Sequence, residues 1–283
     1  MADSNQSIQM ILIEADKWTE KAAEIIVEIP VSLTVNGELW LTFMCTPTDL
    51  EALALGFLYN EGLIQTMDEV VDVRLCPAGD NVDIWLHHPV EKPETWRRTS
   101  GCTGGFTTVD ATRPEQLVAA AITLDGFYIT PNQVSEFVEM LITSQDLYQK
   151  SGGVHTSAIS DGKKVILAAE DIGRHNTLDK IAGLCLLRDL YPHPSIILTT
   201  GRISSEMLQK AARIGASFLI SRTSPSSLSI HMAKDLGITV IGYARRNQFR
   251  VYSHPERIIP NDPTNKKEAE RKGSKDHRDI ASP

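Results

Sequence analysis

Cysteine is scarce in this chain, and no two cysteines stand close together. The 283 residues contain four, at Cys45, Cys76, Cys102 and Cys185. None belongs to a Cys-x-x-Cys pair, so the sequence predicts neither a local zinc site nor a disulfide framework. Scattered single thiols are typical of a reduced environment, and we expect the protein to act in the cytoplasm.

Long apolar runs and a basic leader are also lacking. No stretch approaches the roughly 18 apolar residues that a membrane-spanning helix needs. Residues 1–16 do not show the basic and then apolar pattern of a signal peptide. We therefore expect no membrane partner. The hydrophobic fraction of 42% is ordinary for a globular protein of one large or two modest domains.

Charge is unevenly distributed along the chain. The net charge of −8 combines −15 for residues 1–150 with +6 for residues 151–260 and +1 for the remainder. The acidic first half argues against nonspecific binding to nucleic acid. The basic second half favours a compact anionic ligand such as a nucleotide, or else a solvated surface of mixed charge.

Residues 1–110 are predicted to form a small α+β domain. Two β-rich runs, 31–35 and 38–44, flank Asn36-Gly37, which is a strong hairpin signal. A helix is expected after Thr46-Pro47, with Leu50, Leu53, Ala54 and Phe57 on one face. Strands are expected at 70–75 and 82–87, and an irregular segment at 88–110.

Residues 111–260 are predicted to form an α/β domain. A capping box at Thr130 opens a helix to about residue 148, and a hairpin 154–160/163–169 and a helix 176–190 follow. From residue 195 to 243 strands and helices alternate, which indicates a parallel sheet. This order is similar to the three-layer, mixed-sheet core of cytidine deaminases. The tail 261–283 is charged and is predicted to be disordered.

The deaminase-like order raises the possibility of zinc-dependent hydrolysis, which the sequence excludes. Such enzymes require His-x-Glu and Pro-Cys-x-x-Cys. Here His155 is followed by Thr156-Ser157, and no Cys-x-x-Cys exists. We therefore expect no catalytic zinc and no metal ligands.

Arginines follow each of the three predicted parallel strands. Thr200 leads to Arg202, Ser221 to Arg222, and Tyr243 to Arg245 and Arg246. Ligands of open parallel sheets bind at the carboxyl ends of the strands, and helix N-termini and guanidinium groups favour anions. The pattern predicts a phosphate or pyrophosphate site, although any one of these arginines could be an ordinary loop charge.

Residues 170–176 (EDIGRHN) concentrate polar side chains before a helix. Asn176 could cap that helix with Asp179 three residues later. Capping does not explain why Glu170, Asp171, Arg174 and His175 occur together. His155 stands beside the Gly152-Gly153 turn, and a lone histidine is more often structural than catalytic.

Cys102 lies in a glycine-rich run, RRTSGCTGG, which is not a periodic core segment. A flexible loop would allow its thiol to visit two partners in turn. Arg97 and Arg98 are cations that favour the thiolate, the nucleophilic form. The alternative is an inert surface thiol.

Several blocks of the sequence resemble the formate dehydrogenase accessory proteins, a family of FdhD-type sulfur carriers. They include TPTDLEALALGF, SGCTGG, GGVHTSA, EDIGRHNTLDK and TTGRISSEMLQKAA, and they cover about residues 24–259. The resemblance implies a homodimer that takes persulfide sulfur from a cysteine desulfurase. It also implies transfer of that sulfur to the bis(molybdopterin guanine dinucleotide) molybdenum cofactor before the cofactor enters formate dehydrogenase.

Carried over by position, Cys102 matches the persulfide-bearing cysteine of the family. Gly105 stands where many members have a second cysteine, so a two-thiol relay is not expected, although one thiol suffices for a carrier. The other candidate is a chaperone that binds the cofactor without moving sulfur. The candidate cofactor-binding residues are Tyr243, Ala244, Arg245, Arg246, Asn247, Gln248, Arg202, Ser204, Arg174, His175 and His155.

Overall fold

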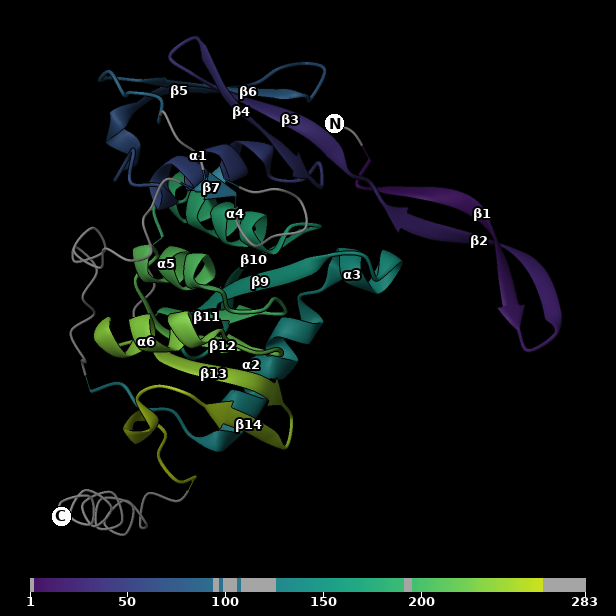
Figure 1. Cartoon of the computed structure of the whole chain (residues 1–283), viewed down its shortest axis with the longest axis vertical. Coiled ribbons are helices and arrows are strands. Elements are labelled where there is room, and N and C mark those ends of the chain that lie inside the picture. Colours follow the sequence, from purple (N-terminus) through teal and green to yellow (C-terminus); the bar gives the residue numbers. More distant parts are fainter. Residues whose placement is uncertain (1–2, 94–96, 99–105, 108–125, 191–194, 262–283) are drawn as a thin grey trace.

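A computed structural model describes residues 3–93, 97–98, 106–107, 126–190 and 195–261. Two sheets with their helices form the body, and a two-stranded arm projects from it (Figure 1). The arm consists of β1 (Asn5–Glu14) and β2 (Lys17–Ile26), which the sequence analysis did not anticipate. In the described part of the chain, no helix is long and apolar enough to cross a membrane.

The N-terminal sheet has the strand order β4-β3-β6-β5. The predicted hairpin is confirmed as β3 (Ile29–Val35) and β4 (Glu38–Cys45), with Asn36 and Gly37 both at positive φ in the turn. Strands β5 (Val70–Leu75) and β6 (Asn81–Leu86) complete the sheet after a 3-10 turn at Met67–Glu69. The segment 88–110 is not wholly irregular, because β7 (Arg97–Arg98) pairs with β8 (Phe106–Thr107).

Helix α1 (Leu50–Asn60) lies between this sheet and α4 (Arg174–Leu187) (Figure 1). The predicted apolar face is buried, but so is most of the rest of α1, because α4 covers its other side. Two glycines allow this contact. A Cβ on Gly56 would lie 1.7 Å from the carbonyl oxygen of Asp179, and one on Gly183 would lie 1.9 Å from that of Ala52. The helix backbones therefore touch directly.

The second sheet is mixed, with the order β10-β9-β11-β12-β13-β14. The predicted parallel strands are confirmed as β11 (Ser195–Thr199), β12 (Ala216–Ser221) and β13 (Thr239–Arg245). Antiparallel neighbours flank them: β9 (His155–Ser160) and β10 (Val165–Asp171) on one side, and β14 (Gln248–Val251) on the other.

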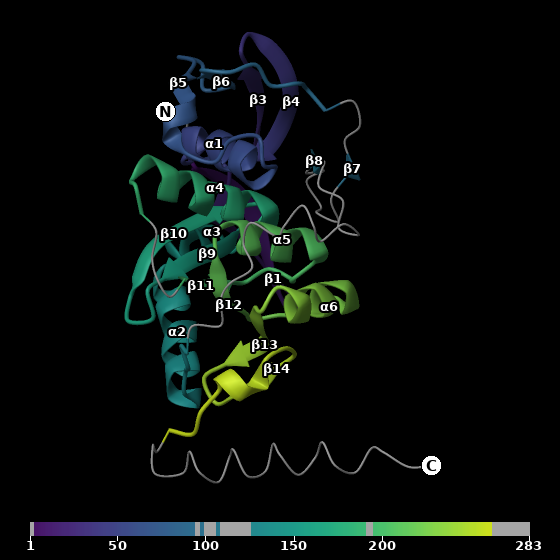
Figure 2. The same ribbon diagram turned by 90° about the vertical axis from the view of Figure 1, so that its left-hand side faces the viewer.

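Helices cover both faces of this sheet and give three layers (Figures 1 and 2). Apolar residues of α4, α5 (Ser205–Arg213) and α6 (Ser227–Asp235) pack on one face, and those of α2 (Pro131–Thr143) pack on the other. The chain is thus a mixed α/β protein. The likeness of the second sheet unit to the cytidine deaminase core and the boundary between two domains near residue 110 remain predictions. Most of the tail that is predicted to be disordered lies outside the described residues.

Three helix boundaries differ from the predicted ones. The helix from Thr130, with its capping box, ends at Thr143, and a separate α3 (Asp146–Ser151) follows. Helix α4 begins at Arg174 with Gly173 at its N-cap, so Asn176 is not the cap. Instead the Asn176 amide donates to Asp171 Oδ1 at 2.8 Å, a buried partner that a local pattern does not reveal. The dipeptide Ser224-Pro225 predicts the start of the following helix, but α6 is capped by Ser226 instead.

Candidate functional site

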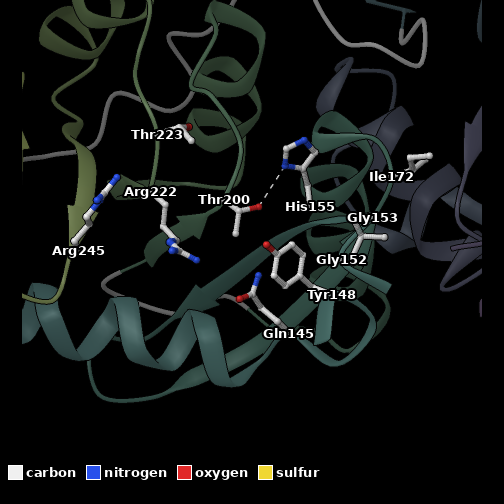
Figure 3. A pocket seen from close by; sticks show the side chains of 11 residues that line it. Gln145, Tyr148, Gly152, Gly153, His155, Ile172, Thr200, Arg222, Thr223 and Arg245 are labelled. Atoms are coloured by element: carbon white, nitrogen blue, oxygen red, sulfur yellow. Dashed lines mark hydrogen bonds between the residues drawn. The ribbon is translucent and has the colours of Figure 1, made fainter. Parts of the chain in front are cut away.

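A cavity of about 490 Å³ opens where the carboxyl ends of the parallel strands meet the start of β9. This volume lies within the range of small-molecule sites. Figure 3 shows Tyr148 and His155 on one side of the cavity and Arg222 and Arg245 on the other. The lining residues are Gln145, Tyr148, Gly152, Gly153, Val154, His155, Ile172, Thr200, Arg222, Thr223 and Arg245.

The sheet topology explains why two arginines meet here. Strands β12 and β13 are parallel neighbours, so Arg222 after β12 and Arg245 at the end of β13 reach the same edge. Both side chains are solvent-exposed, and none of the described lining residues is acidic. Two of the four arginines that follow the parallel strands therefore line one cavity, and the phosphate ligand that their pattern indicates remains a prediction.

His155, the first residue of β9, and Thr200, which follows β11, form a polar wall of the cavity. His155 Nδ1 lies 3.3 Å from Thr200 Oγ1, which also accepts a hydrogen bond from the backbone N–H of Thr156 at 3.0 Å (Figure 3). Partial burial lowers the pKa of His155, and the cations Arg174 and Arg202 lower it further. His155 is therefore a neutral imidazole at neutral pH.

Helix α3 presents Tyr148 to the cavity because Glu170 holds the start of that helix. The buried Glu170 carboxylate accepts hydrogen bonds from the backbone N–H groups of Leu147 and Tyr148, at 2.6 and 3.1 Å. Thr156 Oγ1 also donates to it, and Gln145 Nε2 donates to Thr156 Oγ1. The sequence does not point to Gln145 and Tyr148 as site residues, because its pattern places both inside one long helix. The Gly152-Gly153 turn is the local signal that the chain changes direction nearby.

Asp171 has a structural role in the interior. It pairs with Lys180 at 2.7 Å, and both side chains are fully buried. Its carboxylate also accepts from the backbone N–H of Thr46 at 3.0 Å, while Lys180 donates to Thr46 O and Thr48 Oγ1. Residues 46–48 precede α1, so this buried pair joins the N-terminal sheet unit to α4.

Arg174 and His175 are not among the described residues that line the cavity. Both are buried, and His175 Nε2 lies 3.4 Å from the hydroxyl of Ser204, the N-cap residue of α5. Burial lowers the pKa of His175 well below its usual value, and the positive charge of Lys210 lowers it further. Gly201 passes close to Arg174, since a Cβ on Gly201 would lie 2.9 Å from that of Arg174. Arg202 also lies outside the lining.

The segment from Tyr243 to Gln248 is the end of β13 and the turn into β14. Ala244 is buried in the core, and the Tyr243 ring packs against Arg250, whose guanidinium carbon lies 4.3 Å from the ring centroid. Arg246 pairs with Glu139 of α2 at 3.0 Å, while Asn247 and Gln248 are exposed. Of this segment, only Arg245 is among the described residues that line the cavity. The cofactor role of the others remains a prediction.

Cys102 lies outside the described residues, although its flanks are placed. Arg97 pairs with Thr107 and Arg98 with Phe106. Figure 2 shows the β7–β8 pair set to one side of α1 and α4, and Figure 1 shows α3 on the side from which the arm projects. We expect the 97–106 loop to bring the Cys102 thiol within reach of the cavity, and this remains a prediction.

The other three cysteines have different environments. Burial raises the pKa of Cys45 to about 12, with a contribution from Asp171, and raises the pKa of Cys185 to about 11. These two thiols are thus almost fully protonated at neutral pH, and Cys185 lies in the apolar core, as its neighbours Leu184 and Leu186 indicate. Cys76 is half-buried and donates to Asp80 Oδ1 at 2.9 Å.

Comparison with known proteins gives a consistent result. The model of the FdhD/NarQ family matches residues 26–259. Proteins named sulfur carrier protein FdhD from Staphylococcus aureus strains MRSA252 and Newman are each 34% identical to this chain over 253 residues, covering 88% of it and 95% of the relative. A crystal structure from Desulfotalea psychrophila, described as a candidate formate dehydrogenase accessory protein, has a TM-score of 0.73 at 27% identity, covering 91% of this chain and all (100%) of that one. Because the family model spans most of its length, the chain belongs to the FdhD/NarQ family.

Proposed function

We propose that this protein is a cytoplasmic sulfur carrier that serves formate dehydrogenase. It accepts sulfur from a cysteine desulfurase as a persulfide on Cys102. It then passes the sulfur to the bis(molybdopterin guanine dinucleotide) molybdenum cofactor, the substrate that subsequently enters formate dehydrogenase. The observation that carries the proposal is the 34% identity to proteins named sulfur carriers over 88% of the chain.

The cavity supports the acceptor part of the proposal. Each guanine dinucleotide arm of the cofactor carries a pyrophosphate, and Arg222 and Arg245 supply cations at the cavity edge. Tyr148 offers an aromatic surface to a planar base, and Gln145 and Thr200 offer polar groups to its edge. The neutral His155 can donate one hydrogen bond and accept another.

The chemistry of the thiols supports Cys102 as the carrier. Thiolates attack sulfur far faster than thiols, and the raised pKa values of Cys45 and Cys185 disfavour both. In the loading step the Cys102 thiolate attacks the outer sulfur of the desulfurase persulfide. One S–S bond forms as the other breaks, and the desulfurase cysteine leaves as a thiolate, so the exchange needs no oxidant or reductant.

The test is transfer of labelled sulfur. A desulfurase is supplied with ³⁵S-cysteine and incubated with the wild type, Cys102→Ala or Cys76→Ala, and the label is followed on non-reducing gels. We expect thiol-labile ³⁵S on the wild type and on Cys76→Ala but not on Cys102→Ala. GDP binding, measured by calorimetry, should be the same for all three.

Activation of formate dehydrogenase distinguishes the two candidate functions. A strain that carries only Cys102→Ala should produce inactive formate dehydrogenase while the variant accumulates normally. Full enzyme activity in that strain, or an equal label on Cys102→Ala, would exclude sulfur transfer through this thiol. GDP binding retained under that result would favour the chaperone that binds the cofactor without carrying sulfur.

A further inference from the structure

Among the described residues that line the cavity, Gln145 is the most deeply buried polar one, at 3% exposed. Its Nε2 donates to Thr156 Oγ1 at 3.1 Å. No described residue donates a hydrogen bond to the other amide atom, Oε1. A buried acceptor without a donor is costly, so Oε1 is the atom of this wall that a ligand is expected to satisfy.

The hydrogen bonds behind Gln145 fix which amide atom is left for the ligand. The Glu170 carboxylate can only accept, and it accepts from the backbone N–H groups of Leu147 and Tyr148. Thr156 directs its single hydroxyl proton to Glu170 at 3.1 Å, so its oxygen can only accept from Gln145. A flipped amide would set Oε1 of Gln145 against an oxygen that has no proton to donate. The cavity therefore presents a fixed acceptor at this position.

A fixed acceptor selects a ring whose edge carries N–H groups. Tyr148 lines the same cavity as Gln145 and offers a face on which a planar ring can stack (Figure 3). Guanine and the pterin ring of the proposed cofactor share a 2-amino-4-oxopyrimidine edge, in which an exocyclic amine lies beside a ring N–H. We infer that Gln145 Oε1 accepts a hydrogen bond from this amine and makes the cavity specific for 2-amino rings. The inference rests on the proposed function, because it takes that cofactor as the ligand.

Thr156 and Glu170 are positioning residues in this arrangement, because they act on the ligand through Gln145. Glu170 also holds the start of α3, so its replacement would disturb Tyr148 as well. Thr156 gives the cleaner test. Thr156→Val replaces the hydroxyl by a methyl group of similar size, whereas Thr156→Ser keeps the hydroxyl. Without the hydroxyl, the Gln145 amide loses the partner that fixes its orientation.

Titration calorimetry with GDP and IDP tests the role of Gln145, since IDP differs from GDP only in lacking the exocyclic amine. We expect the wild type to bind GDP about tenfold more tightly than IDP, the effect of one hydrogen bond to a buried group. Gln145→Met keeps the length of the side chain but has no carbonyl, so it should bind the two nucleotides with similar affinity. Gln149→Met is the matched control, because Gln149 belongs to α3, is exposed and is not among the described lining residues. It should keep the preference for GDP.

The positioning role has its own readout, the ratio of the two affinities. Thr156→Ser should keep the preference for GDP, and Thr156→Val should lose most of it. A second pair of probes, pterin and lumazine, differs at the same exocyclic amine and is followed by fluorescence. A preference for pterin over lumazine in place of one for GDP over IDP would support the inference and assign Gln145 to the pterin end of the cofactor.

Three results would overturn the inference. Equal affinity of the wild type for both members of each pair would do so and leave the proposed cofactor site in place, as would a preference that survives in Gln145→Met. A wild type that binds none of the four probes would overturn the cofactor site together with the role of Gln145. The wild-type comparison needs no variant, so it decides the matter even if substitutions at Gln145 or Thr156 prevent folding. None of these results depends on whether Cys102 carries sulfur.

Discussion

Removing either cavity arginine should weaken the binding of a guanine nucleotide through its phosphates. Arg222 and Arg245 are both exposed, so water screens their charges and the lower end of the range for charge-assisted hydrogen bonds applies. We expect Arg222→Ala or Arg245→Ala to lose about 1.5 kcal/mol of GDP binding free energy each, roughly a tenfold increase in Kd.

Titration calorimetry with GDP and with guanosine separates the phosphate contribution from that of the base. Guanosine lacks phosphates, so its affinity should not change in either variant. Arg246→Ala tests whether the predicted cofactor role extends along the same turn: Arg246 is 71% exposed, pairs with Glu139 and is not among the described lining residues, so its effect should be smaller than that of Arg245→Ala. The Arg202→Ala variant should have a smaller effect than Arg245→Ala, since Arg202 does not line the cavity.

Two results would refute this reasoning. Wild-type GDP affinity in both Arg222→Ala and Arg245→Ala would show that the nucleotide does not use this edge of the sheet. Equal losses for GDP and guanosine would show that the arginines support the cavity rather than bind phosphate.

The remaining predictions concern the helix contact and acid stability. Gly56→Ala should destabilise the protein by about 3 kcal/mol, because the new Cβ would lie 1.7 Å from Asp179 O and would force α1 and α4 apart. An unchanged urea midpoint would show that α1 and α4 do not touch at this position. His175 has a folded pKa well below the usual 6.5, so the unfolded state binds the proton more readily and stability falls as the pH drops below about 6.5. Urea unfolding at pH 7.0 and 5.5 should show this loss of unfolding free energy in the wild type, at up to about 1.4 kcal/mol per pH unit. The loss should be smaller in His175→Gln, and equal losses in the two proteins would contradict the prediction.

Local patterns predicted the features that depend on neighbouring residues in sequence. Asn36 and Gly37 both adopt positive φ, which the dipeptide favours, and the capping box at Thr130 is present. The alternation of strands and helices after residue 195 predicted the parallel strands. That topology in turn predicted that arginines following β12 and β13 would meet at one edge.

Features that depend on distant partners could not be predicted in this way. The break between α2 and α3 is stabilised by Glu170, which lies more than twenty residues further along the chain and accepts from the N–H groups of Leu147 and Tyr148. Burial of most of α1 requires α4, and an apolar-rich helix does not reveal which element will cover its second face. The charged β2 strand gave no alternation strong enough to predict the arm.

The polar segment 170–180 shows why clustered charges in a sequence do not by themselves locate a site. Asp171 and Lys180 are fully buried and satisfy one another and the backbone of Thr46, and removing one of such a pair costs roughly 3–5 kcal/mol. A buried charged group needs partners of opposite charge or hydrogen-bonding groups. A segment that joins two sheets through such groups can therefore contain as many polar residues as a binding site. Glu170, next to Asp171, instead orients α3 and Tyr148 at the cavity. The same short strand end therefore holds the two sheet units together and shapes the cavity, while the exposed arginines that line the cavity come from other strands.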